Sequence, residues 1–575
     1  MSSREVVTLQ IGHYSNFIGT HWWNLQESSF VYEPHILTEF PKEVNHDVLF
    51  REGRNLKGEV TFTPRLVLVD LNNSQGSLKR EGALYHDDAE EDIRWVGDVT
   101  LHQAPSARKN QFLQDLEQDE RLALNEMEND DDDVKRPVGR DSDEKLEPDT
   151  CVKLEEKVFG HKTYNLDNDV HVWSDFLRTG FHPRSIHLLQ DYHHDNPEQP
   201  FNIFGVGQQV CSDRSQWDII EDKIRYFTEE CDLLQGFQIL LDNYNAFGGI
   251  AASVLSYLSD EFSTKSRLSF AVTPACPSDQ TAADRSARIL NSALSLYQCF
   301  GDSSLYVPLS LASTVWKSVG PPVHLPHVDY NASLDYHTSA ILAASLDTMT
   351  MPYRKEPGAS RMVDITSTLN SYGRKVSALN MTFPFPLKFG GSFGDCLLDY
   401  GEIDPWVSLT PHVKCTSSPL FQSCVARGVP ANMGKFGTQS GSLPRFLSSS
   451  NSVADVLNSY LTETYPGSCN TACIMRDCLK VGTPFPHIFS RNINQQGYLI
   501  DTLRSSAAGV ETVAAMTSVQ SSVDVGNYIT SLEMVVSKFN IAKHQHFLEA
   551  GLEVDDFAEA VQGLQQLSQC YHENS

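Results

Sequence analysis

The feature that most constrains this chain is a repeated pattern in which a short apolar run leads into a helical pattern. Residues 6–11 form one such run, and residues 63–71 form a second that carries Asp70 near its end. Residues 233–242 and 267–274 repeat the pattern, each followed by residues with helical spacing. Continuous apolar strands that alternate with helices are typical of a mostly parallel sheet covered on both faces. The sequence therefore predicts an α/β domain.

A glycine-poor stretch lies where many nucleotide-binding folds place a phosphate loop. Residues 244–250, "YNAFGGI", connect an apolar run to a helical pattern, and their only glycines are Gly248 and Gly249. A phosphate loop needs glycines because backbone N–H groups must approach the phosphate oxygens with no Cβ between them. Tyr, Asn and Phe side chains fill that space. The plainer interpretation of the two glycines is a strand-to-helix turn.

Composition divides the chain into five parts. Residues 1–110 and 161–375 carry the strand–helix pattern of one nucleotide-binding-type domain. Residues 111–160 are acidic and poor in aromatic residues, which predicts a disordered insertion: a solvated spacer rather than an acidic binding segment. Residues 376–540 are rich in Ser, Gly and Pro and predict a second α+β domain with mobile loops. Apolar residues at helical spacing in 541–575 predict C-terminal amphipathic helices that pack on their own domain.

Net charge and cysteine usage limit the partners and the compartment. The formal net charge of −29 disfavours nucleic acid and anionic lipid as partners and favours basic proteins. The 12 cysteines are scattered singly, and the first residues show no secretory signal pattern, so we expect reduced thiols in the cytoplasm. No apolar run reaches the roughly 18–20 residues of a membrane span, so any membrane association would be peripheral.

Two groups of potential metal ligands have plainer explanations. The first group contains three cysteines and a histidine: Cys469, Cys473, Cys478 and His487. The second contains four histidines: His182, His187, His193 and His194. Zinc sites usually show closer CxxC pairs, which favours reduced structural thiols for the first group. The histidines indicate a polar surface segment. We predict no metal site, and the chain has no Walker pattern.

Several stretches resemble tubulin sequences in the same order along the chain. "REVVTLQIGHYSNFIG" at 4–19 resembles the tubulin opening REIVHIQAGQCGNQIG, and "PRLVLVDL" at 64–71 resembles PRAVLVDL. "ECDLLQGFQ" at 230–238 resembles the CDCLQGFQ that precedes the tubulin signature, and "ALNMTFPFPL" at 378–387 resembles AVNMVPFPRL. Tubulins lack "VWSDFLRTGFHPRS", which together with "HWWN" is similar to Misato, a divergent tubulin-like family linked to mitochondrial distribution and morphology.

The resemblance implies a fold and the position of a nucleotide pocket. The fold would be tubulin-like, with a Rossmann-like, mostly parallel sheet domain, a smaller α+β domain and C-terminal helices. Six residues fall on or beside the family's pocket positions: Gly12, His13, Asp70, Gly248, Gly249 and Asn291. Gly12 keeps the first turn, whereas His13 replaces a glutamine. Asn291 falls on the asparagine that reads guanine. We expect a vestigial pocket without a bound cofactor, although weak GTP or GDP binding remains open.

The same resemblance argues against hydrolysis. In the family, a neighbouring subunit presents an acidic residue to the attacking water. Counted back from Asn380, the acidic positions fall on Gly373 and Val376, and neither side chain can act as a general base. Arg288 reverses the charge of the glutamate that binds ribose. We therefore predict that the protein is not an enzyme and that it has no catalytic residues.

Three functions follow from the resemblance as alternatives. The leading prediction is a non-catalytic regulator of mitochondrial distribution, morphology and fusion, acting from the cytoplasm or peripherally on the mitochondrial outer membrane. Its partners would be proteins of the outer-membrane fusion machinery, with residues 111–157 and the C-terminal helix as candidate docking elements. The first alternative is an active, filament-forming GTPase. The second is a factor in tubulin folding or microtubule organisation that meets a cytosolic chaperonin or tubulin.

Overall fold

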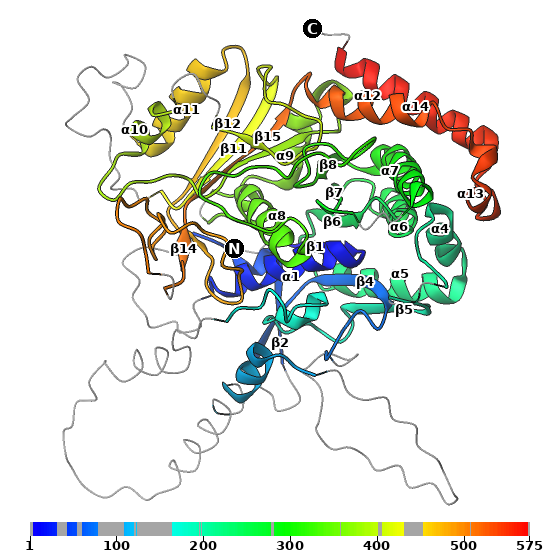
Figure 1. The fold of residues 1–575 in the computed structure, drawn as a ribbon, viewed down its shortest axis with the longest axis horizontal. Helices are drawn as coiled ribbons and strands as arrows, with labels where there is room; N and C mark the ends of the chain where they lie inside the picture. The colour runs from blue at the N-terminus through cyan, green and yellow to red at the C-terminus, as the bar shows by residue number, and fades with distance from the viewer. Residues whose placement is uncertain are drawn as a thin grey trace, which may run out of the picture.

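Two sheets with helices around them form the body of the protein in a computed structural model (Figure 1). It describes residues 4–30, 43–54, 60–78, 108–119, 122, 164–194, 196, 198–277, 281–356, 358–400, 405–429, 452–505 and 508–572. Within these residues the larger sheet has six strands, all parallel, which confirms the predicted α/β class.

The strands of the larger sheet follow the doubly wound order β5-β4-β1-β6-β7-β8. Their bounds are β1 Val6–Ile11, β4 Leu66–Asn72, β5 Ile186–His193, β6 Gly236–Asp242, β7 Ser266–Val272 and β8 Leu305–Leu309. The strand order reverses between β1 and β6, so the crevice beyond the carboxyl ends of these two parallel strands is the place where such sheets bind ligands. Every residue of β6 is buried, as a central parallel strand requires.

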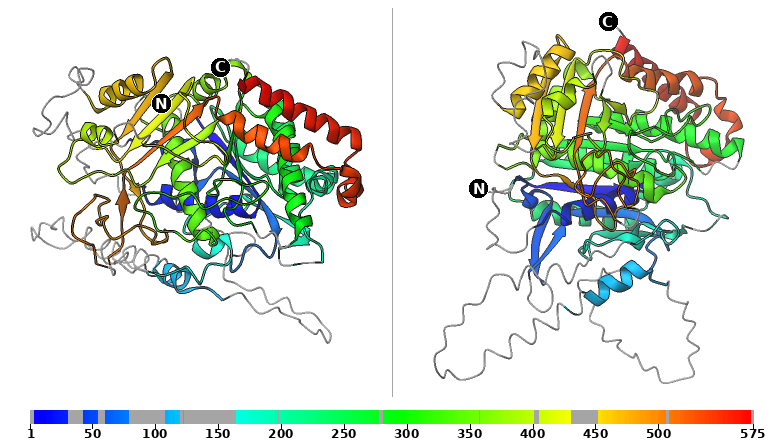
Figure 2. Two further views of the ribbon diagram at one scale, coloured as in Figure 1. Left: turned by 45° about the horizontal axis from the view of Figure 1, so that its top comes forward. Right: turned by 60° about the vertical axis from the view of Figure 1, so that its left-hand side comes forward.

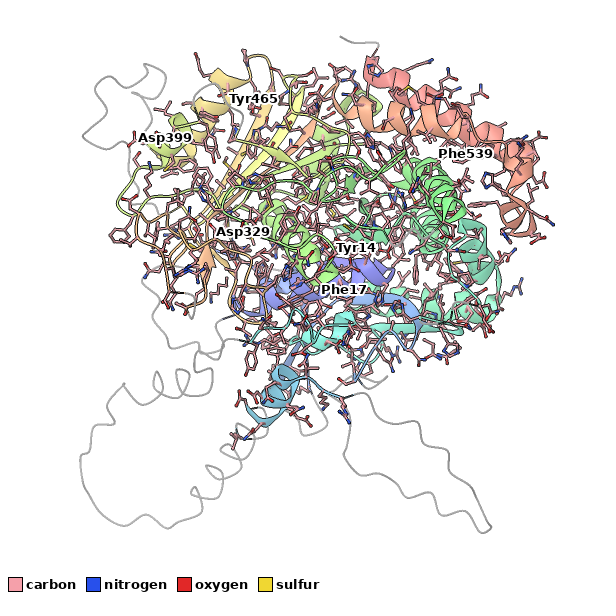
Figure 3. All side chains as sticks on the ribbon, viewed as in Figure 1. Tyr14, Phe17, Asp329, Asp399, Tyr465 and Phe539 are labelled. Carbon is pink, nitrogen blue, oxygen red and sulfur yellow. The ribbon has the colours of Figure 1, made fainter. Side chains whose placement is uncertain are left out.

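Helices cover both faces of this sheet. The helices are α1 His13–Glu27, α4 Phe204–Ser212, α5 Arg214–Glu229, α6 Phe247–Glu261, α7 Ala282–Asp302, α8 Asp335–Met349 and α9 Met362–Leu369. Successive residues of β6 point to opposite faces of the sheet. Leu240 packs in the hydrophobic cluster that contains α1 and α8, whereas Ile239 and Leu241 pack in the cluster that contains α4 to α7. Tyr14 and Phe17 of α1 lie deep in the molecule (Figure 3).

The second sheet has the order β10-β9-β15-β11-β12 and is antiparallel except for the β11–β12 pair. Its elements are β9 Ala378–Thr382, α10 Phe393–Leu398, β10 Val407–Ser408, β11 Phe421–Arg427, α11 Val453–Thr464, β12 Cys469–Met475 and β15 Ala515–Ser521. Two small two-stranded sheets pair β2 Phe50–Arg54 with β3 Val60–Pro64, and β13 Leu479–Lys480 with β14 Thr512–Val513. Short 3₁₀ helices occupy His46–Val48, Trp173–Phe176, Met351–Tyr353, Ser371–Gly373 and Ile541–Lys543. The α8 helix contacts α1 of the larger domain and strands β11 and β15 of the second sheet.

The chain ends in α12 Val525–Val536, α13 Gln545–Glu549 and α14 Val554–His572. In Figure 2 α12 and α14 lie side by side against the green part of the larger domain. Phe557, Leu564 and Leu567 of α14 are buried there, so its apolar face packs on its own domain as predicted. Within the described residues, none of the helices has the length and apolar character needed to cross a bilayer.

Three predictions from the sequence need correction. Residues 111–119 are helical, and Phe112 is only 7% exposed in the main core, so the start of the predicted insertion is ordered. Of residues 120–160 only residue 122 is described. His187 is buried within β5 and does not lie on the predicted polar surface. The helical spacing of apolar residues in 219–227 predicts Ile219 on the buried face of α5, but this side chain is 43% exposed. Most of the Ser-rich loop at 438–453 lies outside the described residues.

Candidate functional site

The crevice between β1 and β6 brings three of the predicted pocket residues together. Gly12 follows β1 and precedes α1, with a φ of +123° that side chains rarely adopt. A Cβ at this position would lie 2.4 Å from the Asp242 Cγ atom. Gly12 is therefore required because the last side chain of β6 approaches the backbone at the entrance to α1.

The Asp242 carboxylate occupies the amino end of α1. Its Oδ1 atom accepts hydrogen bonds from the Ser15 N–H at 2.8 Å and the Ser15 hydroxyl at 2.7 Å, and its Oδ2 atom accepts from the Tyr14 N–H at 3.1 Å. The amino end of a helix at this crevice is where a phosphate would bind, because its N–H groups and dipole favour an anion. Burial raises the pKa of Asp242 to about 6, although the hydrogen bonds from Ser15 and Tyr14 oppose this.

His13 and Asp70 form a pair at the same edge of the sheet. The His13 Nδ1 atom lies 3.1 Å from Asp70 Oδ2, which also accepts from the Asn16 amide at 2.9 Å and the Trp173 indole at 2.9 Å. Burial lowers the pKa of His13, but the charge and hydrogen bond of Asp70 and the charges of Asp242 and Asp335 together outweigh it, and the pKa is raised overall. For Asp70 burial raises the pKa, and the imidazole charge and the hydrogen bonds lower it below its ordinary value. The pair is therefore an internal ion pair.

The two predicted loop glycines lie inside helix α6 and not in the turn before it, which corrects the sequence interpretation. A Cβ on Gly249 would lie 2.1 Å from the Phe204 carbonyl oxygen of α4, and a Cβ on Gly248 would lie 3.2 Å from the Ser295 Cβ of α7. Phe247 begins the helix, and its ring packs against Phe201 with centroids 5.0 Å apart. The glycines thus allow neighbouring helices to approach α6 closely.

Asn291 holds backbone groups of its own chain. The side chain is completely buried, and its Oδ1 atom accepts from the Phe204 N–H at 2.9 Å. Its Nδ2 atom donates to the Asn202 carbonyl at 2.7 Å and to the Tyr244 carbonyl at 2.9 Å. Both amide hydrogens and the oxygen are therefore engaged, which leaves no donor for reading a base.

The positions that the family would use for hydrolysis carry no acid here. Gly373 lies in a short turn with a φ of +75°, next to Tyr372, which is 79% exposed. Val376 is completely buried, and its N–H donates to the Tyr571 hydroxyl at 2.9 Å. Arg288 donates from its Nη1 atom to the Val315 carbonyl within the core.

Sequence reasoning missed two acids of the crevice. Asp242 ends an apolar run in the same way that Asp70 does, and that shared pattern could have identified it. Asp335 starts α8, and burial raises its pKa although the His13 charge lowers it. Three carboxylates therefore surround one imidazole. This environment repels a triphosphate, and the residues present do not fit one.

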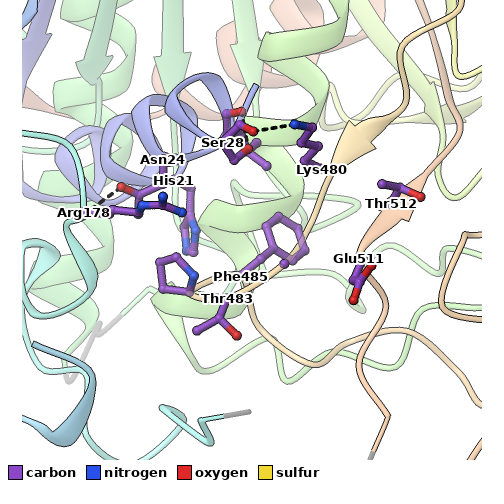
Figure 4. Close-up of a pocket in the computed structure, with 12 residues that line it drawn as sticks. His21, Asn24, Ser28, Arg178, Lys480, Thr483, Phe485, Glu511 and Thr512 are labelled. Carbon is purple, nitrogen blue, oxygen red and sulfur yellow. Dashed lines mark hydrogen bonds between the residues drawn. The ribbon is translucent and has the colours of Figure 1, made fainter. Parts of the chain in front are cut away.

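The cavity drawn in Figure 4 lies away from this crevice, between α1 and the segment around β13. Its volume is about 290 Å³. The Lys480 ammonium donates to the Ser28 carbonyl at 2.7 Å at its edge. The His21 Nε2 atom lies 2.9 Å from the Tyr336 carbonyl, and burial lowers the pKa of His21 to about 3, so the ring is neutral. Lys480 and His21 thus interact with backbone carbonyls of this chain.

The group of three cysteines and a histidine singled out in the sequence does not form a cluster of metal ligands. Cys469 and Cys473 lie four residues apart on β12, a separation of about 13 Å along a strand. Two ligands of one metal ion must lie much closer than that. In the described part of the chain no group of three or more His, Cys, Asp or Glu residues is arranged to hold a metal ion.

Comparisons with known proteins agree with this architecture. A family model described as the Misato Segment II tubulin-like domain matches residues 4–118, and one described as the tubulin domain matches residues 164–355. Protein misato homolog 1 of Homo sapiens is 35% identical over 577 aligned positions, covering 99% of this chain and 98% of the relative. Protein misato of Drosophila melanogaster is 30% identical over 582 positions, with the same coverage. The resemblance seen in the sequence is confirmed: the chain belongs to the Misato family of tubulin-like proteins.

Proposed function

We propose that this protein is a non-catalytic, tubulin-like regulator of mitochondrial distribution, morphology and fusion that binds other proteins and carries no nucleotide. The observation that supports the non-catalytic part is the Asp242 carboxylate at the amino end of α1. It satisfies the N–H groups that would otherwise receive a phosphate. A triphosphate would have to displace this carboxylate and approach Asp70 and Asp335 as well.

The cellular role rests on the family resemblance and not on the crevice. Misato proteins are linked to mitochondrial distribution, and a tubulin-like fold supplies a large surface without needing chemistry. We propose action from the cytoplasm and peripherally at the mitochondrial outer membrane, through partners in the fusion machinery. A cytosolic chaperonin or tubulin is the alternative partner.

The nucleotide content of the purified protein tests the non-catalytic proposal. The full chain is purified gently and denatured, and the released nucleotides are quantified by chromatography. We expect far less than one equivalent of GDP or GTP, and no saturable binding of added GTP at concentrations up to the millimolar range. One equivalent of bound nucleotide, or GTP turnover that rises with protein concentration, would instead support the filament-forming GTPase.

The proposed location has a separate test. Cells depleted of the protein are imaged for mitochondrial distribution, and the wild-type chain is reintroduced. Recovery of the network, together with release of the protein from mitochondrial membranes by alkaline carbonate, is the expected result. Co-purification with chaperonin subunits and no change in the mitochondrial network would favour the folding-factor alternative.

A further inference from the structure

A polar groove lies where α4, α7 and the start of α14 meet, near the right-hand edge of Figure 1. Its volume is about 310 Å³. The walls carry the amides of Gln208 and Gln298, the Tyr297 hydroxyl and the carboxylates of Asp556 and Glu559. None of the described residues that line it is a lysine, an arginine or a histidine.

Hydrogen bonds hold the walls of the groove in place. The Gln208 amide donates to the Gln298 Oε1 atom at 2.8 Å, which connects α4 to α7. The Tyr297 hydroxyl donates to the Glu559 Oε1 atom at 2.9 Å, which connects α7 to α14. The Gln298 amide and the Glu559 carboxylate are thus held in place on helices, which favours a defined contact with a ligand.

The segment that leads into α14 beside the groove is rich in acidic residues. Residues 545–559 contain five carboxylates and no lysine or arginine. Glu549, Glu553 and Asp555 are exposed beside the groove, as are its own two carboxylates. Leu294 and Leu552 line the groove and offer an apolar contact. A cation on a long alkyl stem matches this combination of charge and apolar surface.

We propose that this groove receives a lysine or arginine side chain from a basic segment of a partner protein. The charged head would lie against Asp556 and Glu559, and the alkyl stem would contact Leu552. The inference deepens the proposed function, because it gives the chemistry of one partner of an interaction protein. Charge complementarity determines the kind of occupant, and the amides of the walls can donate and accept hydrogen bonds with the backbone of the partner segment.

The test removes charge without removing hydrogen bonds. Asp556→Asn keeps an acceptor for the Glu553 N–H, which Asp556 now binds at 3.3 Å, and Glu559→Gln keeps an acceptor for Tyr297. The full-length double variant is titrated with a fluorescent peptide of alternating arginine and serine, at physiological salt. The matched control carries Asp218→Asn and Asp222→Asn on α5, an equal change of charge at exposed positions.

Loss of two exposed ion pairs should weaken binding of the peptide about fivefold, with the α5 control within about twofold of wild type. Gln298→Arg places a guanidinium in the groove and should weaken binding as well. Equal weakening by both charge variants would assign the attraction to the general acidic field and overturn the proposal. Unchanged binding in the groove variant would overturn it too. A bound nucleotide would refute the proposed function separately, because the groove contains none of His13, Asp70 and Asp242.

Discussion

Replacing Asp242 with alanine tests whether an internal carboxylate has taken the place of a phosphate. The side chain is completely buried and receives three hydrogen bonds from Tyr14 and Ser15. Its removal leaves the N–H groups at the amino end of α1 without an acceptor and leaves space for a small anion. We expect Asp242→Ala to bind inorganic phosphate and the wild type not to bind it.

The pKa of Asp242 sets the size of the effect on stability. Because its pKa in the folded protein is raised to about 6, the folded state holds this proton more tightly than the unfolded state. Ionisation therefore destabilises the fold as pH rises, by about 1.6 kcal/mol at pH 5 and about 3 kcal/mol at pH 7.5. Alanine removes this penalty and loses a helix cap that contributes about 1–2 kcal/mol at either pH. The stability of the variant relative to wild type should thus improve by about 1.4 kcal/mol between the two pH values.

Chemical denaturation of both proteins at the two pH values measures these differences. The measurement is repeated with and without about 50 mM phosphate at constant ionic strength, which stabilises a protein by about 1 kcal/mol if Kd is about 10 mM. Asp399→Ala is the matched control, because this carboxylate lies at the surface and its side chain is 67% exposed (Figure 3). The control should respond to phosphate and to pH as the wild type does.

Three results would refute the reasoning. If phosphate stabilises Asp242→Ala no more than it stabilises the wild type, the amino end of α1 is not a latent anion site. If the relative stability of the variant does not improve from about pH 5 to about pH 7.5, the carboxylate is not a buried group with a raised pKa. Phosphate binding by the wild type itself would show that Asp242 does not block the site.

Three further substitutions test other parts of the structure by chemical denaturation. Asn291→Ala should lower the free energy of unfolding by about 3 kcal/mol, because three backbone groups lose their partner; a loss below about 1 kcal/mol would contradict it. Gly249→Ala should cost about 2 kcal/mol or more, since its Cβ would meet a backbone oxygen at 2.1 Å, whereas Gly301→Ala, with nothing within 4 Å, should cost nothing. Asp347→Ala should lower the free energy of unfolding by about 3–5 kcal/mol, because it leaves Arg354 and Arg427 buried without their carboxylate. A near-neutral effect would refute this.

The sequence predicts the central strands well because burial on both faces leaves a direct signal. The run at 6–11 coincides with β1, and the runs that contain β4, β6 and β7 are equally continuous. The outer strands β5 and β8 are not predicted in the same way. In β5 two histidines, a glutamine and an aspartate interrupt the apolar pattern, and β8 contains a proline within "LYVPL". An edge strand pairs on one side only, so its sequence needs less apolar continuity and gives a weaker signal.

The candidate site illustrates a different limit. The sequence places Gly12, His13 and Asp70 in one crevice, and the structure brings them together. The sequence cannot show which groups of the chain form hydrogen bonds in this crevice, because the partners come from distant parts of the chain. Ser15 and Asp242, for example, are 227 positions apart. The role of Asn291 was obscured for the same reason, since its partners belong to the segments before α4 and α6. Tertiary hydrogen bonding has no local pattern from which it could be read.

The structure also explains why glycines occur at positions that match a nucleotide-binding motif. Gly12 is required by the approach of Asp242, and Gly249 by the approach of the Phe204 carbonyl oxygen. In both positions a protein group of this chain now takes the space that the absence of a Cβ provides. A glycine that matches a nucleotide-binding motif therefore indicates close approach but not what approaches. The hydrogen-bond partners of the neighbouring N–H groups decide that question, and at the amino end of α1 the partner is a carboxylate of the protein itself.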